Sequence, residues 1–197
     1  LRARTKTYLE KTIKHKDRET LESYLQFEIE EGWVEHSRKL KTKTKSYKLR
    51  KEKEKSDLLK NEVWCMLAKM GFKELSKDDE FAITDPKSFE EHKIDIYARD
   101  ENCVLLVLCD QLEEPGVSKK VDQRIDEIQS IRSGIEQNIR KKFQGIKVKW
   151  VIATRRISWS AALKNKAKEE NISVLSDKDI DYYNKNTQLL KTAARYQ

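Results

Sequence analysis

The spacing of apolar side chains divides the later part of the chain into alternating helices and strands. Apolar residues from Leu59 to Met70 recur at helical spacing, and Gly71 follows where such a helix would end. Residues 104–109 are continuously apolar, which is typical of a central strand covered on both faces. Ser118 precedes a long amphipathic pattern that reaches Phe143 and predicts a helix.

Shorter patterns complete this part of the chain. They predict further strands at 81–83, 94–97, 148–153 and 172–175, helices at 160–170 and 177–190, and turns at Asp85-Pro86 and 100–102. The resulting order from residue 56 is α-β-β-β-α-β-α-β-α. Strands interleaved with helices predict an α/β fold with a mixed sheet flanked by helices on both sides.

The first 55 residues follow a different pattern. Asp17 is placed to cap a helix that ends before Gly32, and the apolar residues of 8–13 suggest a shorter helix ahead of it. The run 48–55 is so rich in charge that we interpret it as a linker. We therefore expect two domains, a small helical and basic extended appendage at 1–55 and a core at 56–197.

Charge is distributed unequally between these parts. The 197 residues carry a net charge of +8, yet residues 1–60 hold 18 basic and 11 acidic side chains, so most of the excess lies there. The longest apolar run, Cys103 to Cys109, is too short to cross a membrane. Three cysteines without CxxC spacing and the absence of an apolar leader favour a reducing, cytoplasmic setting. The first residue is Leu1, which suggests a longer native chain.

The segment Arg38–Lys51 contains eight basic residues and no acid. Within it Lys41, Lys43 and Lys45 alternate with hydroxyl residues, a period that would place their ammonium groups about 6–7 Å apart on one side of an extended strand. Such a row suits a nucleic-acid backbone. The predicted nucleic-acid-binding residues are Lys39, Lys41, Lys43, Lys45, Lys48, Arg50 and Lys51. A solvated linker, or a surface for an acidic protein, would have the same composition.

Three segments together resemble a known family. The stretch from Glu62-Val63-Trp64 through Met70-Gly71-Phe72, the strand Lys93-Ile94-Asp95-Ile96-Tyr97 and the run Val104 to Asp110 resemble a restriction-endonuclease-like PD-(D/E)XK domain. The resemblance covers roughly residues 56–190. The chain is also similar to the nuclease-like region that precedes the DGQHR domain in proteins associated with DNA modification, although the string DGQHR is absent.

The resemblance implies a magnesium-dependent nuclease site. It assigns Asp95 as the metal-binding aspartate of a hairpin and Glu62 as the acid of the preceding helix. The third strand departs from the pattern, because Leu108-Cys109-Asp110 stands where Glu-x-Lys is expected. Leucine binds no metal, and a carboxylate in place of the lysine reverses a charge that would stabilise the anionic transition state.

Two interpretations follow from this departure. In the first, the core is degenerate and binds DNA without cutting it. In the second, the site is rearranged: Glu62, Asp95 and Asp110 bind Mg²⁺, and Lys93, Lys119 or Lys120 replaces the missing lysine. Asp95, Asp110 and Lys93 are then the catalytic residues. The sequence thus predicts a DNA-binding, nuclease-like domain associated with DNA modification or defence; the alternatives are an active endonuclease and a protein-interaction module.

Other catalytic classes find little support in the sequence. Neither GxGxxG nor GxxxxGK[ST] occurs, and the three histidines lie in separate segments without metal-ligand spacing. A nucleophilic Cys109 assisted by His92 would need an activating environment, whereas Cys109 ends an apolar run typical of a buried strand.

Overall fold

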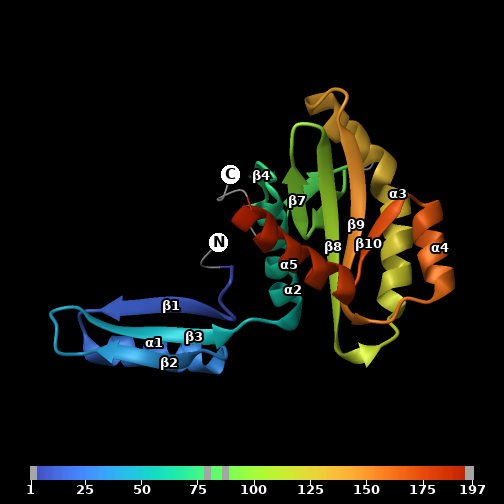
Figure 1. The fold of residues 1–197 in the computed structure, drawn as a ribbon. Helices are drawn as coiled ribbons and strands as arrows, with labels where there is room; N and C mark the ends of the chain where they lie inside the picture. The colour runs from blue at the N-terminus through green and yellow to red at the C-terminus, as the bar shows by residue number, and fades with distance from the viewer. Residues whose placement is uncertain (1–3, 78–80, 86–88, 194–197) are drawn as a thin grey trace. The chain divides into compact units, whose positions relative to one another are not determined.

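The computed structural model describes residues 4–77, 81–85 and 89–193, and the chain forms two compact units, Leu1–Glu54 and Lys55–Gln197 (Figure 1). The described residues contain five helices and ten strands. None of the described helices is long and apolar enough to cross a membrane.

The first unit is an antiparallel three-stranded sheet with a helix on one of its faces. Its elements are β1 (Tyr8–His15), α1 (Arg18–Glu30), β2 (Val34–Lys39) and β3 (Lys45–Glu52). The strand order is β1-β3-β2, so the last strand lies in the centre.

Helix α1 begins and ends where the sequence predicts. The Asp17 carboxylate accepts a hydrogen bond from the N–H of Thr20 at 2.8 Å, and Gly32 follows the helix with a φ of +85°, a conformation that favours glycine. Leu21 of α1 packs against Tyr47 and Leu49 of β3, and all three are buried. A small apolar core thus holds the helix on the sheet.

Two expectations for this unit are wrong. The segment Tyr8–Ile13 is a strand rather than a helix, and β1 pairs with β3 along all its length. Leu9 and Ile13 are four residues apart, a spacing that puts side chains on one face in a helix and in a strand alike. The expected linker at 48–55 belongs instead to β3 and to the start of the next helix, because the buried Leu49 alternates with charged neighbours.

The second unit is built on a mixed five-stranded sheet of order β10-β9-β8-β7-β4. Its elements in chain order are α2 (Lys55–Met70), β4 (Glu74–Leu75), β5 (Phe81–Thr84), β6 (Glu91–Ile94), β7 (Ile96–Arg99), β8 (Cys103–Gly116), α3 (Lys119–Lys142), β9 (Lys147–Ile157), α4 (Ala161–Glu169), β10 (Ile172–Leu175) and α5 (Asp177–Ala193). Strands β8, β9 and β10 are parallel, and β7 and β4 join antiparallel.

Helices cover both faces of this sheet, as the sequence predicts (Figure 1). Ile125, Ile128 and Ile135 of α3 pack with Leu106 and Leu108 of β8 in one apolar cluster, which also includes a residue of α4. Residues of α2 and α5 form a second cluster with the other side of β7, β8 and β9. The parallel strands are therefore buried on both faces, which explains the continuous apolar run of β8.

The strand expected at 94–97 is divided in the structure. Asp95 forms a bend, β6 before it pairs with β5 in a separate two-stranded sheet, and β7 after it joins the main sheet. The expected turn at 100–102 is confirmed, because Asp100 accepts hydrogen bonds from the N–H groups of Asn102 and Cys103. Of the expected Asp85-Pro86 turn, Pro86 lies outside the described residues.

Candidate functional site

Asp95 occupies the bend between β6 and β7, and protein donors engage both of its carboxylate oxygens. Oδ2 accepts a hydrogen bond from the backbone N–H of Cys109 at 2.7 Å. Oδ1 lies 2.9 Å from Nζ of Lys60 on α2, and the two side chains are only 13% and 16% exposed. The ion pair is thus largely shielded from water, where a charge-assisted contact is stronger than at the surface.

Asp110 follows Cys109 on β8 and is buried. Oδ2 lies 3.3 Å from Nε of Arg124 on α3, whose Nη1 also contacts Glu127 at 2.8 Å. Burial raises the pKa of Asp110, the Arg124 guanidinium opposes that rise, and the charge of Asp95 adds to it. The two aspartates therefore lie close enough for one charge to disfavour the other.

The lysines near Asp95 and Asp110, which we call the carboxylate pair, differ in exposure and in their effect on these two residues. The positive charge of Lys120, in the first turn of α3, acts on Asp110 and lowers its pKa against the effect of burial. Lys119 beside it is exposed. Lys93, expected to serve the site, is exposed on β6 two residues before Asp95. Lys60 contacts Asp95, and Arg124 contacts Asp110.

The cysteine and leucine beside Asp110 are core residues. Burial raises the pKa of the Cys109 thiol well above its ordinary value, and the charge of Asp95 raises it further. A thiol so disfavoured as a thiolate is a poor nucleophile. Leu108 is 1% exposed and belongs to the apolar cluster under α3. The position where the resemblance to a PD-(D/E)XK domain would place a glutamate thus holds a buried apolar side chain.

The structure places Glu62 in a different cluster. Its two oxygens receive Nη2 and Nε of Arg155 at 2.6 and 3.2 Å, and Asn184 donates to it at 3.1 Å. Nη2 of Arg155 also contacts Asp181 at 2.7 Å. Burial opposes the charged form of Arg155, but hydrogen bonds to Asp181 and Glu62 outweigh that effect and raise its pKa. Glu62 therefore joins α2, β9 and α5.

Within the ranges that the structure describes, no three His, Cys, Asp or Glu side chains gather closely enough to hold a metal ion. Asp95 and Asp110 supply two carboxylates, and Mg²⁺ sites with one or two protein carboxylates complete their coordination with water and substrate phosphate. Mg²⁺ binding by Glu62, Asp95 and Asp110 stays a prediction.

Sequence reasoning missed Lys60 and Arg124, although the pattern of their helices contains the signal. Lys60 precedes Val63 by three residues, and Arg124 follows Val121 by three, so each lies on the edge of an apolar face. A single lysine or arginine at the edge of a helix's apolar face can reach the sheet against which that face packs. Helical periodicity places Glu62 at an edge of the apolar face of α2 as well, so it could not show whether Lys60 or Glu62 lies near Asp95.

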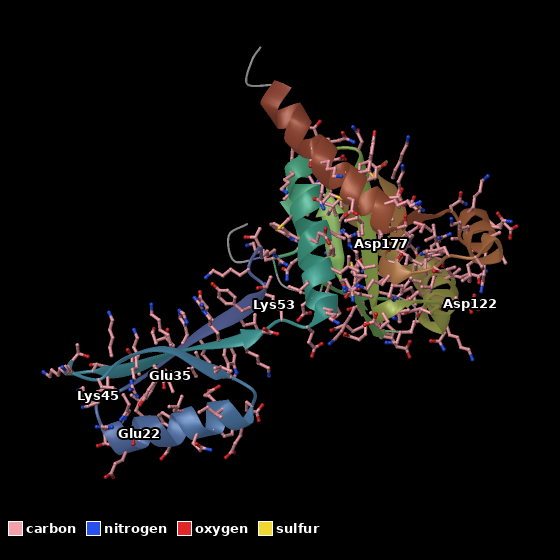
Figure 2. The ribbon with its side chains drawn as sticks, turned by 60° about the horizontal axis from the view of Figure 1, so that its bottom comes forward. Glu22, Glu35, Lys45, Lys53, Asp122 and Asp177 are labelled. Atoms are coloured by element: carbon pink, nitrogen blue, oxygen red, sulfur yellow. The ribbon has the colours of Figure 1, made fainter. Side chains whose placement is uncertain are left out.

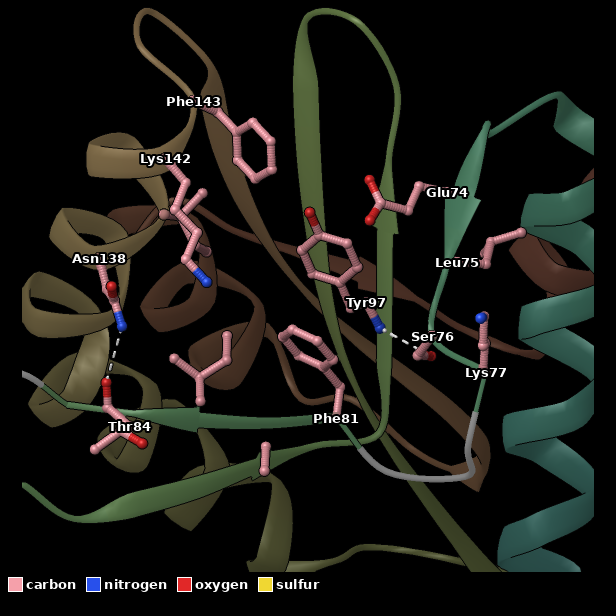
Figure 3. A pocket seen from close by; sticks show the side chains of 13 residues that line it. Glu74, Leu75, Ser76, Lys77, Phe81, Thr84, Tyr97, Asn138, Lys142 and Phe143 are labelled. Atoms are coloured by element: carbon pink, nitrogen blue, oxygen red, sulfur yellow. Dashed lines mark hydrogen bonds between the residues drawn. The ribbon is translucent and has the colours of Figure 1, made fainter.

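A separate cavity of about 600 Å³ opens beside β5, β7 and the end of α3 (Figure 3). The rings of Phe81 and Tyr97 stack in it with centroids 4.6 Å apart, and Asn138 donates a hydrogen bond to the backbone oxygen of Thr84 at 3.1 Å. The cavity is lined by neither aspartate of the carboxylate pair. It is therefore not an extension of that site.

The predicted nucleic-acid-binding residues of the first unit divide into two groups. Lys45 donates to the backbone oxygen of Lys16 at 2.9 Å, Lys51 donates to that of Glu31 at 2.6 Å, and Arg50 pairs with Glu10 at 3.1 Å. Exposed side chains that make no such contact with described residues form the second group: Lys39, Lys41, Lys43 and Lys48. Lys41 and Lys43 lie in the connection between β2 and β3, not on the expected strand.

No protein-family model and no curated protein matches the chain. A solved structure titled as the protein of unknown function AF1548 is similar with 17% identity and a TM-score of 0.44, covering 58% of this chain and 54% of its own. The protein VC1899 from Vibrio cholerae is similar with 11% identity and a TM-score of 0.48, covering 92% of this chain and 47% of its own. The chain thus spans about half the length of each, and its function has to be inferred from its own residues.

Proposed function

We propose that this chain is a DNA-binding, nuclease-like domain whose carboxylate pair is neutralised by the protein's own cations, so that it holds DNA without cutting it. The observation that carries the proposal is the pairing of Asp95, one of whose oxygens contacts the ammonium group of Lys60 while the other accepts a hydrogen bond from the N–H of Cys109. Arg124 does the same for one oxygen of Asp110.

The chemistry of metal-dependent hydrolysis explains why this arrangement is unfavourable for cleavage. A divalent cation needs carboxylate lone pairs, and it uses them to activate water and to stabilise charge on the phosphoryl group. Here an incoming cation would compete with the positive charge of Lys60, which already lies against Asp95 in a contact that is mostly shielded from water. The buried Leu108 in place of a third carboxylate leaves little to compensate for that displacement.

The DNA-binding half of the proposal rests on charge. The first 60 residues hold 18 basic and 11 acidic side chains, and Lys39, Lys41, Lys43 and Lys48 are exposed. Neutralising phosphates with lysine releases condensed counterions and supplies sequence-independent affinity. The resemblance to the nuclease-like region of DGQHR-domain proteins supports a role associated with DNA modification or defence.

A second candidate function is a Mg²⁺-dependent endonuclease with a rearranged site. One observation favours it: burial raises the pKa of Asp110 and the charge of Asp95 adds to that rise, as expected when one carboxylate lies near another. In that enzyme Lys60 or Lys120 would hold the attacking water or the scissile phosphate after the metal binds.

The decisive experiment is incubation with supercoiled plasmid and Mg²⁺ or Mn²⁺, together with a gel-shift measurement at low salt. We expect retardation of the plasmid without nicking, in the wild type and in Asp95→Asn alike. Nicking that disappears in Asp95→Asn would establish the endonuclease and overturn the non-cutting proposal. Failure to retard DNA at low salt would overturn DNA binding and favour the protein-interaction module.

A further inference from the structure

The sheet of the first unit presents one face to α1 and leaves the other without a helix. Tyr47 and Leu49 of β3 point toward α1, so their neighbours Ser46, Lys48 and Arg50 point to the opposite side, which we call the open face. Figure 2 shows side chains projecting from the sheet on the side away from α1.

The strand register assigns the remaining residues of the open face, because directly paired residues share a face. Across the sheet the open face consists of four rows: Lys14, Ser46 and Lys39; Thr12, Lys48 and Ser37; Glu10, Arg50 and Val34; and Tyr8 with Glu52. The first two rows contain three lysines, three hydroxyl groups and no acid. We call these two rows the lysine-hydroxyl half.

The other two rows differ in charge. Glu10 pairs with both Lys6 and Arg50, and Glu52 adds a further acid. In the lysine-hydroxyl half, by contrast, the side chains of Lys14, Lys39 and Lys48 are exposed and make no ion pair with any described residue. Lysines that make no ion pair with described residues are therefore concentrated at the end of the sheet that carries the β2–β3 connection.

The dimensions of this half suit a phosphate backbone. Neighbouring strands lie about 4.8 Å apart, so Lys14 and Lys39 on the two outer strands start about 10 Å apart. Lys48 lies one row away, about 6–7 Å along the strand direction. Lysine, serine and threonine are side chains that commonly contact phosphate oxygens, and they carry no base preference when they do so.

The aromatic residue of the open face is not available for stacking on bases. The guanidinium of Arg50 lies 4.2 Å from the centroid of the Tyr8 ring, and Nζ of Lys6 lies 5.5 Å from it. Single-stranded nucleic acid is held chiefly by free aromatic rings beside a basic groove. The open face therefore favours a duplex, whose bases need no stacking partner.

We propose that the lysine-hydroxyl half, together with Lys41 and Lys43 of the β2–β3 connection, binds the phosphate backbone of duplex DNA. The inference rests on the proposed function and specifies its substrate. The β2–β3 connection lies beyond the last paired residues of the two strands, and the major groove of B-DNA, which is about 12 Å wide, admits an element of two strands. The major groove of an RNA duplex is too narrow for that. The connection would enter the groove while the sheet contacts the backbone beside it.

The test compares two triple variants of the whole chain with equal loss of charge. One carries Lys14→Gln, Lys39→Gln and Lys48→Gln on the open face. The matched control carries Lys11→Gln, Arg18→Gln and Arg38→Gln, which lie on α1 or on the face toward it. Circular dichroism verifies that both are folded, and fluorescence anisotropy measures Kd for a labelled 30-base-pair duplex across a salt series.

For the open-face variant we expect the slope of log affinity against log salt to become shallower by about 2.7, or 0.9 for each of three phosphate contacts. The control should retain nearly the wild-type slope. Equal losses in both variants would overturn the assignment to the open face while leaving DNA binding intact. Equal affinity of the wild type for single-stranded DNA or duplex RNA would overturn the choice of duplex DNA. No binding of the wild type to any nucleic acid at low salt would refute the proposed function itself.

Discussion

Leu108 stands where the resemblance to a PD-(D/E)XK domain would place a metal-binding glutamate, and its burial allows a quantitative prediction. The side chain is 1% exposed in the cluster between β8 and α3. Truncating a fully buried leucine to alanine costs the transfer free energy plus a cavity contribution, together about 3–4 kcal/mol in a well-packed core. With a urea m-value of about 2 kcal/mol/M, Leu108→Ala should lower the unfolding midpoint by about 1.5–2 M.

Replacing Leu108 with glutamate tests whether a carboxylate at this position can bind a metal ion. Leu108→Gln has nearly the same shape as Leu108→Glu without the charge, so the difference between the two isolates the carboxylate. Burial and the charges of Asp95 and Asp110 should raise the pKa of the new carboxyl. Because the folded state then holds the proton more tightly than the unfolded chain, Leu108→Glu should lose stability relative to Leu108→Gln as pH rises above about 4.3.

The assay is urea unfolding followed by circular dichroism from pH 4 to pH 8, with and without 10 mM Mg²⁺. We expect Leu108→Glu to be the less stable variant at pH 7 and Mg²⁺ to change neither midpoint. If Leu108→Glu were at least as stable as Leu108→Gln at pH 7 in Mg²⁺, and only in Mg²⁺, then the position would complete a working metal site. The inference that the buried position of Leu108 cannot take part in metal binding would then be refuted.

Three further predictions concern other contacts. The raised pKa of Asp110 makes the folded state lose stability as this carboxyl ionises. In Asp110→Asn the free energy of unfolding should therefore decline less between pH 4 and pH 7 than in the wild type. Parallel pH profiles of the two proteins in urea unfolding would contradict this. Arg155→Met should lower the free energy of unfolding by about 1–2 kcal/mol, because Glu62 loses two hydrogen bonds from the guanidinium while its side chain is 35% exposed to water. Urea unfolding measures this loss, and a value below about 0.5 kcal/mol would show that the cluster contributes little to stability. Gly134→Ala should lower the free energy of unfolding by about 1–3 kcal/mol although alanine has the better helix propensity, because the new Cβ would lie 2.4 Å from Oδ1 of Asp85. A rise in melting temperature would show that the side chain of Asp85 moves away without cost.

The longest periodic segments of the core were predictable because burial repeats along them many times. Helix α3 contains enough apolar residues for its period to be unambiguous, and Ser118 is its N-cap. Strand β8 was predictable from a short, continuously apolar run, which is typical of a strand buried on both faces. The first unit offers no such redundancy. Its apolar core holds three buried residues, and β3 exposes charge on every other position, so Leu49 alone between Lys48 and Arg50 does not reveal a central strand.

The candidate site was predictable in part for a similar reason. The face of β8 that carries Leu106 also carries Asp110, and alternation alone establishes that relation. The partners of the carboxylates depend instead on how α2 and α3 rotate over the sheet. Lys60 and Glu62 both border the apolar face of α2, and only the packed helix determines which of them meets Asp95.

Helix α2 is fixed about its own axis by this packing. Lys60 and Glu62 are two residues apart, about 200° around a helix, and each is bound to a different strand region, through Asp95 and through Arg155. Turning the helix to bring Glu62 toward Asp95 would break both ion pairs at once. Bringing Glu62, Asp95 and Asp110 together would therefore require helix α2 to pack on the sheet in a different orientation, and substitutions within β8 alone would not achieve it.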